Sequence, residues 1–281
     1  MAAQRRTADR PTGLAALPAD YGPLFDRAVA VLGGDERVRA VWLAGALARG
    51  AADAASDLDF VVAVRDDDFE PFAAAWHDWL AAISPTLVAR ELPGLPGSFY
   101  ALTPACLRFD VVTERVSRIG ASEGGARLPV LDRDGLHARL PAPAERRPDP
   151  ARIAYLVEEC LRQAANFPTV TVRGDWLLGV VAVQEVHLML YQLFVEANQP
   201  SPPMGAKRWS AKLTAAQAAA LAALPVPQPR RESVLEARQA ALRAFLEQAR
   251  PIAARCGVPW PDALEAAVRD FLRRELDLPL G

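Results

Sequence analysis

The sequence predicts an α+β protein in two parts, a mixed sheet with helices followed by an all-helical bundle. Runs of strand length alternate with helix-like apolar spacing up to about residue 118, and five helix-like stretches follow residue 150. Between them, the segment 140–150 (LPAPAERRPDP) carries four prolines in eleven residues. Because such a segment is typical of a boundary, we expect one domain over 1–145, with its core at about 20–118, and a helical domain over 146–281.

The first domain is expected to alternate between helices and strands. The helix-like spacing of 21–33 ends at two glycines, and acidic residues at 66–68 suit a helix start because they complement the helix dipole. Pro and Gly residues separate the apolar runs further along the chain. The predicted helices are 21–33 and 66–80, and the predicted strands are 38–43, 58–64, 86–91, 98–103 and 107–113.

The second domain is expected to contain helices only. Each stretch with helical spacing is bounded by Pro, Gly or a residue that caps helix N-termini. Long helices of this kind pack side by side in a bundle. The predicted helices are 152–166, 175–198, 214–224, 231–256 and 261–276.

The composition excludes several classes of protein. Of the 281 residues, 51% are apolar and 23% are charged, which is typical of a globular chain and not of a disordered one. A net charge of −2 and a pI of about 6.0 argue against a nucleic-acid partner, because binding to a phosphate backbone needs a basic protein surface. Cys106, Cys160 and Cys256 lack zinc-site spacing and fit a reducing cytoplasm, where we expect the protein.

No membrane partner is expected. The basic N-terminus is not followed by the apolar segment of a signal peptide. The longest apolar stretch, 176–195, is interrupted by Gln184, Glu185, His187 and Gln192. Because one acidic side chain at mid-membrane costs about 2.5–3.5 kcal/mol on insertion scales, we interpret this stretch as a buried helix.

Two aspartates lead into the second predicted strand. Asp57 and Asp59 are two residues apart, so in extended backbone their carboxylates lie on the same face. Two negative charges at this separation repel one another unless a cation neutralises them. Carboxylate and phosphate oxygens are hard ligands that suit Mg²⁺. The pair therefore predicts a site for Mg²⁺ together with a phosphate-bearing ligand.

A loop of small residues precedes this pair and suits a phosphate group. Gly45 lets the backbone approach a ligand closely, and the N–H groups at Gly45 and Ala46 are free of side-chain obstruction. Arg49 would add a positive charge and Ser56 a hydroxyl, although both also suit a purely structural part in the loop. Together with the aspartates, the loop predicts a metal–triphosphate site.

A third carboxylate is expected from the strand 107–113. Its alternation places Asp110 and Arg108 on one face, opposite Phe109 and Val111, which we expect in the core. If this strand neighbours the strand 58–64, Asp110 lies beside the aspartate pair. Three carboxylates can hold two metal ions, which activate an attacking oxygen and stabilise a leaving phosphate.

The stretch from Gly45 to Asp59 resembles the signature of the polymerase-β-type nucleotidyltransferase superfamily: Gly-Ser, a spacer, Gly, then Ser-Asp-x-Asp. With a helical second domain, the chain is similar to the antibiotic adenylyltransferases of the aminoglycoside and lincosamide type. The resemblance implies that Asp57, Asp59 and Asp110 hold two Mg²⁺ ions with ATP. It further implies that AMP passes to a hydroxyl of an acceptor, with release of pyrophosphate.

Ala46 departs from this signature, because it stands where the family has serine. Loss of one hydrogen bond to a charged group weakens binding by about 1.5–3 kcal/mol. Three functions therefore stay open: AMP transfer to a small molecule such as an aminoglycoside-type antibiotic, nucleotidyl transfer to a protein or RNA, and nucleotide binding without catalysis. The acidic pI disfavours RNA, and a helical domain in the same chain favours a small-molecule acceptor.

The helical half offers three further candidates. Glu185 lies on one helix stripe with Gln192 and Glu196, which suits a solvated face. Alternatively, apolar neighbours would make Glu185 a good general base for the acceptor hydroxyl. Lys207 and Lys212 are the only lysines among 32 basic residues, and lysine binds phosphate as a point charge. We weigh a triphosphate contact by these lysines equally with a solvated basic loop.

Two other features of the helical half have simpler interpretations. Asp175 is expected to cap the helix that follows it, although with Trp176 it would also suit a cationic sugar. His187 is expected to be a core histidine with its hydrogen bonds satisfied, outside the site.

Overall fold

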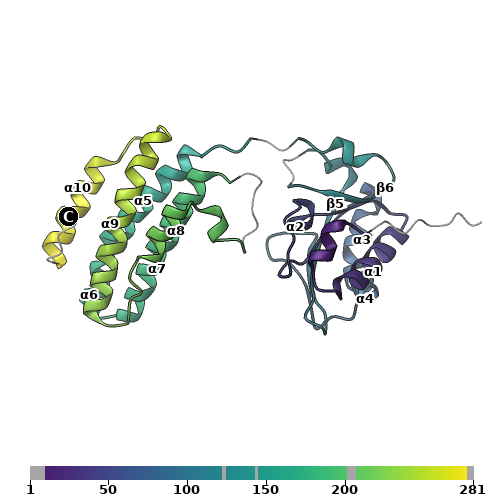
Figure 1. The fold of residues 1–281 in the computed structure, drawn as a ribbon, viewed down its shortest axis with the longest axis horizontal. Coiled ribbons are helices and arrows are strands. Elements are labelled where there is room, and N and C mark those ends of the chain that lie inside the picture. Colours follow the sequence, from purple (N-terminus) through teal and green to yellow (C-terminus); the bar gives the residue numbers. More distant parts are fainter. Residues whose placement is uncertain (1–9, 122–124, 143–144, 201–206, 277–281) are drawn as a thin grey trace, which may run out of the picture. The chain divides into compact units, whose positions relative to one another are not determined.

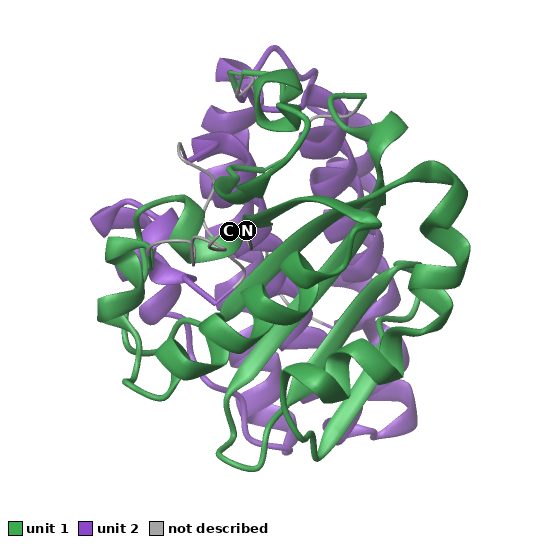
Figure 2. Ribbon diagram, turned by 90° about the vertical axis from the view of Figure 1, so that its right-hand side faces the viewer, with its two compact units in different colours: residues 1–145 green, residues 146–281 purple. Residues whose placement is uncertain are grey.

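The computed structural model describes residues 10–121, 125–142, 145–200 and 207–276. The chain divides into two compact units, Met1–Glu145 and Arg146–Gly281, shown in green and purple in Figure 2. Each unit has hydrophobic clusters of its own. The two units are described in turn.

A six-stranded mixed sheet is the centre of the first unit, with strand order β3-β4-β5-β2-β1-β6. The two central strands, β5 and β2, pair in parallel, and every other pairing is antiparallel. The strands are β1 (Val38–Leu43), β2 (Leu58–Val64), β3 (Val88–Glu91), β4 (Ser98–Leu102), β5 (Arg108–Arg115) and β6 (Leu128–Asp132). The mixed sheet of the predicted α+β class is therefore confirmed.

Edge strand β6 is missing from the sequence prediction. It pairs with β1 only, and it contains Pro129, which lies opposite Trp42. Proline has no N–H to donate, so a run that contains it does not resemble a strand. At the edge of a sheet the missing donor faces no further strand, which is why the sheet tolerates Pro129.

The main core of this unit lies on one face of the sheet. Helices α1 (Tyr21–Gly34), α3 (Phe69–Ala74) and α4 (Trp76–Ile83) cover that face, as Figure 1 shows. A smaller cluster around Trp42 lies on the opposite face. The remaining short helices are η1 (Thr12–Ala16), α2 (Gly45–Ala48), η2 (Asp66–Asp68), η3 (Val116–Arg118) and η4 (Leu136–Arg139).

The single helix predicted over 66–80 is wrong in one respect, since it is broken at Ala75. The indole N–H of Trp79 donates to the carbonyl oxygen of Phe72 at 3.0 Å. That carbonyl would accept from Trp76 in a continuous helix. A buried side chain therefore takes over a bond of the helix, which the spacing of apolar residues does not reveal.

The second unit is a helical bundle, which confirms the other half of the predicted fold class. Helices α5, α7 and α9 run side by side around one large core (Figure 1). The predicted caps are present, because Asp175 accepts from the backbone N–H of Leu178 and Thr214 forms a capping box with Gln217. The helices are α5 (Pro150–Asn166), α6 (Pro168–Arg173), α7 (Trp176–Asn198), η5 (Ser210–Lys212), α8 (Ala215–Ala222), α9 (Arg231–Arg255) and α10 (Asp262–Leu276).

Helix α7 is long and apolar enough to cross a membrane, judged by length and hydropathy alone. In the structure it packs against α5, α6, α8 and α9. Val183, Val186, Leu190 and Phe194 are fully buried in the shared core. This packing is that of a bundle helix, as the sequence predicts.

Candidate functional site

Asp59 and Asp110 lie side by side on the two central strands. The parallel register of β2 and β5 pairs Asp59 directly with Asp110. Neighbouring strands are about 4.8 Å apart, so the two carboxylates occupy adjacent positions on one face. Both residues are half-buried. The structure therefore brings together two of the three aspartates that the sequence singles out.

These two aspartates face away from the main core. Their strand neighbours Phe60 and Phe109 belong to the large cluster beneath the helices, whereas Val61, two residues after Asp59, belongs to the small cluster on the opposite face. Because side chains alternate along a strand, Asp59 and Asp110 share this second face. The alternation along β5 thus places Phe109 and Val111 in the main core and Asp110 on the opposite face of the sheet.

Gly45 fits directly against the Asp59 carboxylate. Its φ is +58°, and a β-carbon at this position would overlap Oδ2 of Asp59. Just before it, the N–H of Ala44 donates to the carbonyl oxygen of Asp59 at 2.8 Å. Glycine is therefore required at Gly45 both by its left-handed backbone and by the acid it contacts. The small-residue loop and the acidic strand form one continuous surface.

Asp57 approaches a cation that the sequence prediction does not assign to it. Its Oδ2 lies 3.6 Å from a guanidinium nitrogen of Arg108, and 21% of its side chain is exposed. Arg108 also donates to the carbonyl oxygen of Ala55 at 3.0 Å, and its own backbone N–H donates to the hydroxyl of Tyr21. Arg108 therefore ties the loop before β2 to the start of β5. The alternation of Arg108 with Asp110 is the sequence signal for this position.

Ser56 is committed to the structure of its own loop. Its hydroxyl donates to Oδ1 of Asp53 and accepts from the backbone N–H of Asp53, both at 3.0 Å. Ser56 is 9% exposed. This hydroxyl could contact a phosphate ligand or support its own loop, and in the structure it supports the loop.

Ala46 and Arg49 occupy opposite ends of the short helix α2. Ala46 is half-buried, and its carbonyl oxygen accepts from the N–H of Ala51 at 3.0 Å. Arg49 follows the helix and is also half-buried. Within the described ranges, no salt bridge engages the Arg49 side chain, so its charge is available to an anion.

The strand register extends the acidic pair into a longer polar row. Arg90 on β3 pairs with Tyr100 on β4, and Tyr100 pairs with Asp110 on β5. Directly paired residues point to the same face of a sheet, so these side chains continue the line from Asp59. The guanidinium of Arg90 lies 5.8 Å from the centre of the Tyr100 ring. Strand order places Arg90 and Tyr100 here, and single-strand patterns carry no signal for it.

The acids suit a Mg²⁺ ion that is shared with a phosphate ligand. Over the described parts of the chain, no cluster of three His, Cys, Asp or Glu side chains is arranged to hold a metal ion by itself. Mg²⁺ commonly binds through one or two carboxylates and completes its coordination with substrate phosphates and water. Asp59 and Asp110 supply this donor set, with Asp57 two residues away. The open Gly45 backbone beside them gives a phosphate room to approach.

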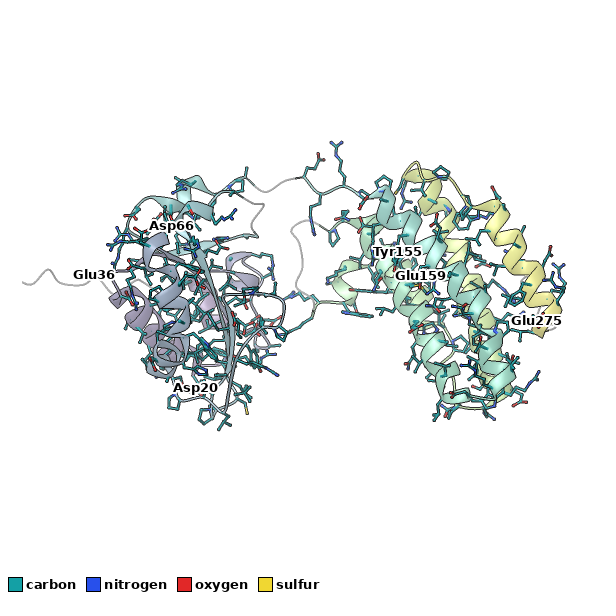
Figure 3. The ribbon with its side chains drawn as sticks, turned by 180° about the vertical axis from the view of Figure 1, so that it is seen from behind. Asp20, Glu36, Asp66, Tyr155, Glu159 and Glu275 are labelled. Atoms are coloured by element: carbon teal, nitrogen blue, oxygen red, sulfur yellow. The ribbon has the colours of Figure 1, made fainter. Side chains whose placement is uncertain are left out.

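Glu185, Lys207 and Lys212 belong to the helical unit. Glu185 is exposed on α7, and its charge acts on Arg162 and Arg238. Arg162 also donates to Glu159 on α5, which is labelled in Figure 3. Lys207 is exposed, and Lys212, at the end of η5, accepts at its carbonyl oxygen from Asn198.

The apolar surroundings expected for Glu185 are not present. Leu178, Val181 and Leu188 are themselves 41–49% exposed, while the buried face of the helix carries Val183 and Val186. Because apolar residues encircle α7, their spacing does not identify which side is covered. Glu185 therefore belongs to a charged surface.

The expectation of a satisfied core histidine at His187 is also wrong. Nε2 of His187 and the hydroxyl of Tyr191 are buried and have no hydrogen-bond partner among the residues described. Burial lowers the pKa of His187 from its usual value near 6.5. The sequence locates the residue on the correct helix, but its hydrogen bonding depends on what the neighbouring segments supply.

No protein-family model matches the sequence, and no curated protein matches it either. Solved structures that align with the chain include the following two. An aminoglycoside 6-adenyltransferase from Bacillus subtilis aligns with a TM-score of 0.42 and 15% identity, over 89% of this chain and 95% of that chain. CdnC from E. coli MS115-1, determined with ATP, aligns with a TM-score of 0.26 and 13% identity, over 93% and 91% respectively.

Proposed function

We propose that the chain is a Mg²⁺-dependent nucleotidyltransferase that moves AMP from ATP to a hydroxyl of a small molecule, with an aminoglycoside-type antibiotic as one candidate acceptor. The observation that carries the proposal is the pairing of Asp59 with Asp110 across β2 and β5, with Gly45 packed against the Asp59 carboxylate. Acids alone are common on protein surfaces. Acids that are registered on central strands beside an open glycine backbone suit a metal-bound triphosphate.

In this proposal the reaction is an in-line displacement. A bond forms between the acceptor oxygen and the α-phosphorus of ATP, and the bond from that phosphorus to the bridging oxygen of pyrophosphate breaks. Bound Mg²⁺, with two ions expected, supplies neutralisation of the phosphate charge and activation of the attacking oxygen. Asp59 and Asp110 would hold the metal, with Asp57 as the third candidate ligand.

The other candidate residues position the triphosphate and accept the proton. The backbone at Gly45 and Ala46 approaches the phosphates, and Arg49 adds a cation whose charge is not engaged by a salt bridge in the described structure. Ser56 stabilises the loop through the hydrogen bond that its hydroxyl donates to Asp53.

The helical unit contributes at a second level of the proposal. Lys207 and Lys212 are the candidate phosphate-binding cations of this unit, as point charges. Glu185 is its candidate general base for the acceptor hydroxyl. Because Glu185 is exposed on α7, we expect the smallest contribution to turnover from this residue.

Transfer of label from ATP tests the reaction. The full chain is incubated with [α-³²P]ATP, Mg²⁺ and a panel of hydroxyl-bearing antibiotics, and products are separated by thin-layer chromatography. We expect the label on a small molecule. Unlabelled pyrophosphate should be released in an amount equal to that of the labelled product. Asp59→Asn should lower turnover by about a hundred- to a thousandfold, because removal of one group that stabilises the reacting centre is of that order.

Asp67→Asn is the matched control, since Asp67 is exposed in the short helix η2 and outside the paired strands. It should turn over at the rate of the unmodified chain. Equal activity of Asp59→Asn and Asp67→Asn would overturn the metal assignment. Label on a protein or RNA instead of a small molecule would change the acceptor class and keep the chemistry.

Ala46 favours a second candidate, a protein that binds nucleotide without turning it over. The backbone N–H of Ala46 remains for binding, but the hydroxyl of the family signature is absent. Ala46→Ser separates the two functions. A rise in AMP transfer of about tenfold, equivalent to one hydrogen bond of about 1.4 kcal/mol, would support catalysis, whereas saturable ATP binding without pyrophosphate release in either chain would support the second candidate.

A further inference from the structure

The helical unit contains a pocket between α7, α8 and the segment around η5. Its volume is about 390 Å³, within the range of pockets that bind small molecules. Its walls include Leu188 and Tyr191 of α7, Trp209 and Ser210 of the η5 segment, and Ala218 of α8. All of these residues belong to one unit, so the pocket does not depend on the acidic site of the sheet.

The lining of this pocket is neutral and largely apolar. No Asp, Glu, Lys or Arg side chain is among the described residues that line it. His187, the one lining residue that titrates near neutral pH, has its pKa lowered by burial, so it is uncharged at pH 7. A charged ligand would find no counter-ion here and would lose its hydration. A neutral occupant fits the lining.

An aromatic wall closes one side of the pocket. The rings of Tyr191 and Trp209 stack with centres 3.8 Å apart and an angle of 5° between their planes. Tyr191 is 6% exposed, whereas Trp209 is 51% exposed. The outer part of the indole is therefore open, and a flat apolar molecule can pack on it.

Two polar atoms beside this wall lack partners. Nε2 of His187 and the hydroxyl of Tyr191 are buried, and no described residue hydrogen-bonds to either. Both residues line the pocket. Buried polar groups in folded proteins are nearly always satisfied by protein, water or ligand. A hydroxyl both donates and accepts, so one hydroxyl group in the pocket is able to satisfy an imidazole nitrogen or a phenol.

We propose that this pocket binds a neutral, mainly aromatic small molecule that carries a hydroxyl group. The ring system packs against Trp209 and Leu188. A small shift of the exposed Trp209 ring, which stacks on Tyr191, gives the ligand hydroxyl access to the enclosed, unpartnered atoms of His187 and Tyr191. The site is separate from the carboxylates of the sheet and does not rest on the proposed nucleotidyl transfer. It gives the helical unit a ligand of its own.

Binding of 2-naphthol to the full chain tests the proposal. Equilibrium dialysis at pH 7.5 should give saturable binding at one site per chain. Naphthalene, which has the ring system without the hydroxyl, should bind at least fivefold more weakly, because a site with buried polar atoms rejects an analogue that cannot pair with them. Tyr191→Phe should reduce this ratio, and it should fold normally because its hydroxyl has no partner to lose.

A pair of variants on α8 locates the site. Ala218 lines the pocket, whereas Ala219, its neighbour, is exposed and does not line it. Ala218→Phe should fill the cavity and weaken 2-naphthol binding at least tenfold, and Ala219→Phe should leave binding unchanged. The absence of saturable binding to the unmodified chain would overturn the proposal, as would equal binding by the two variants.

Discussion

The two units present ligand surfaces of opposite character. On the sheet of the first unit, Asp59 and Asp110 stand in register beside an open glycine backbone, so the surface carries charge. In the second unit, the pocket beside Tyr191 and Trp209 is neutral and aromatic, and its polar atoms lack partners. The first surface needs a cation before an anionic ligand binds it. The second needs a ligand that completes its hydrogen bonds without bringing charge.

The comparison shows that the burial of a polar group limits which charge its ligand site can hold. The acids of the sheet are half-buried, which lets water and ions share their charge, whereas the hydroxyl of Tyr191 is fully enclosed. An uncompensated charge in the enclosed site would be far more costly than an uncompensated hydroxyl. Each prediction below changes one of the two surfaces and leaves the other in place.

Among the substitutions that keep all three aspartates, the largest effect is expected from a methyl group at Gly45. Gly45 and Gly50 both have positive φ, +58° and +65°, so alanine is strained at either by about 1–2 kcal/mol. Only at Gly45 does the new β-carbon meet the Asp59 carboxylate, and at Gly50 it meets open space. Gly45→Ala should lower the rate of AMP transfer by about a hundredfold, the loss typical of a 1 Å misplacement of a reacting group.

Gly50→Ala is the matched control for backbone strain. Its rate should stay within about threefold of the unmodified chain, since the strain alone does not move the acid. Urea titrations of both variants should show similar losses of stability of the first unit, and 2-naphthol binding should be the same in both. Equal loss of activity in the two variants would mean that backbone strain, and not the contact with Asp59, limits the site.

The next largest effect is expected from removal of metal, which should abolish stabilisation by a ligand of the acidic surface and leave stabilisation by a ligand of the neutral pocket unchanged. Mg-ATP at a hundred times its dissociation constant stabilises the state that binds it by about 2.7 kcal/mol, so the thermal transition of the first unit should rise. EDTA or Asp57→Asn should abolish that rise. Stabilisation by 2-naphthol should be identical with and without EDTA, because none of the three proposed metal-binding aspartates is among the described residues that line its pocket. A naphthol effect that required Mg²⁺ would remove the distinction between the two sites.

A smaller effect is expected from Arg108. Its guanidinium lies 3.6 Å from Asp57, where it would compete with the proposed metal ion for the same carboxylate. Exposed ion pairs of this kind contribute about 0.2–1 kcal/mol. Arg108→Gln should therefore lower the Mg²⁺ concentration for half-maximal activity by about two- to fivefold, measured by magnesium titration at saturating ATP.

Arg115 offers a matched control at the other end of β5. It pairs with Glu70 and lies on the same strand as Arg108. Arg115→Gln removes the same charge from the strand without touching Asp57, and its magnesium requirement should be unchanged. A parallel shift in both variants would indicate an effect of net charge on the whole unit.

The elements that sequence predicts best are those whose local pattern decides their structure. Strands β1 and β2 are apolar except for Arg39 and Asp59, and their predicted and observed bounds agree. Strand β6 is missed because Pro129 removes a donor, and at the edge of the sheet this proline is tolerated. Helix α6 is missed because it begins at Pro168, directly after α5 ends at Asn166, and proline is favoured in the first turn of a helix.

The residues of the candidate site also fall into those that a local pattern predicts and those that only the strand order places. The spacing of Asp57 and Asp59, and the face of Asp110, follow from alternation along single strands. Tyr100 and its neighbour Arg90 join the row only through the order of strands in the sheet. That order depends on pairing between distant segments, which no local window contains.

The smallest predicted effect concerns the proton that the neutral pocket excludes. Burial lowers the pKa of His187 below its usual 6.5, so the unfolded chain binds this proton more readily than the folded one. Stability of the helical unit should therefore fall as pH drops below about 6.5, until it passes the lowered pKa of the folded state. His187→Gln should remove this component, whereas His77→Gln, exposed on α4, should retain it. Urea titrations between pH 5 and 8 measure it, and an identical pH dependence in both variants would mean that the pocket does not exclude charge through His187.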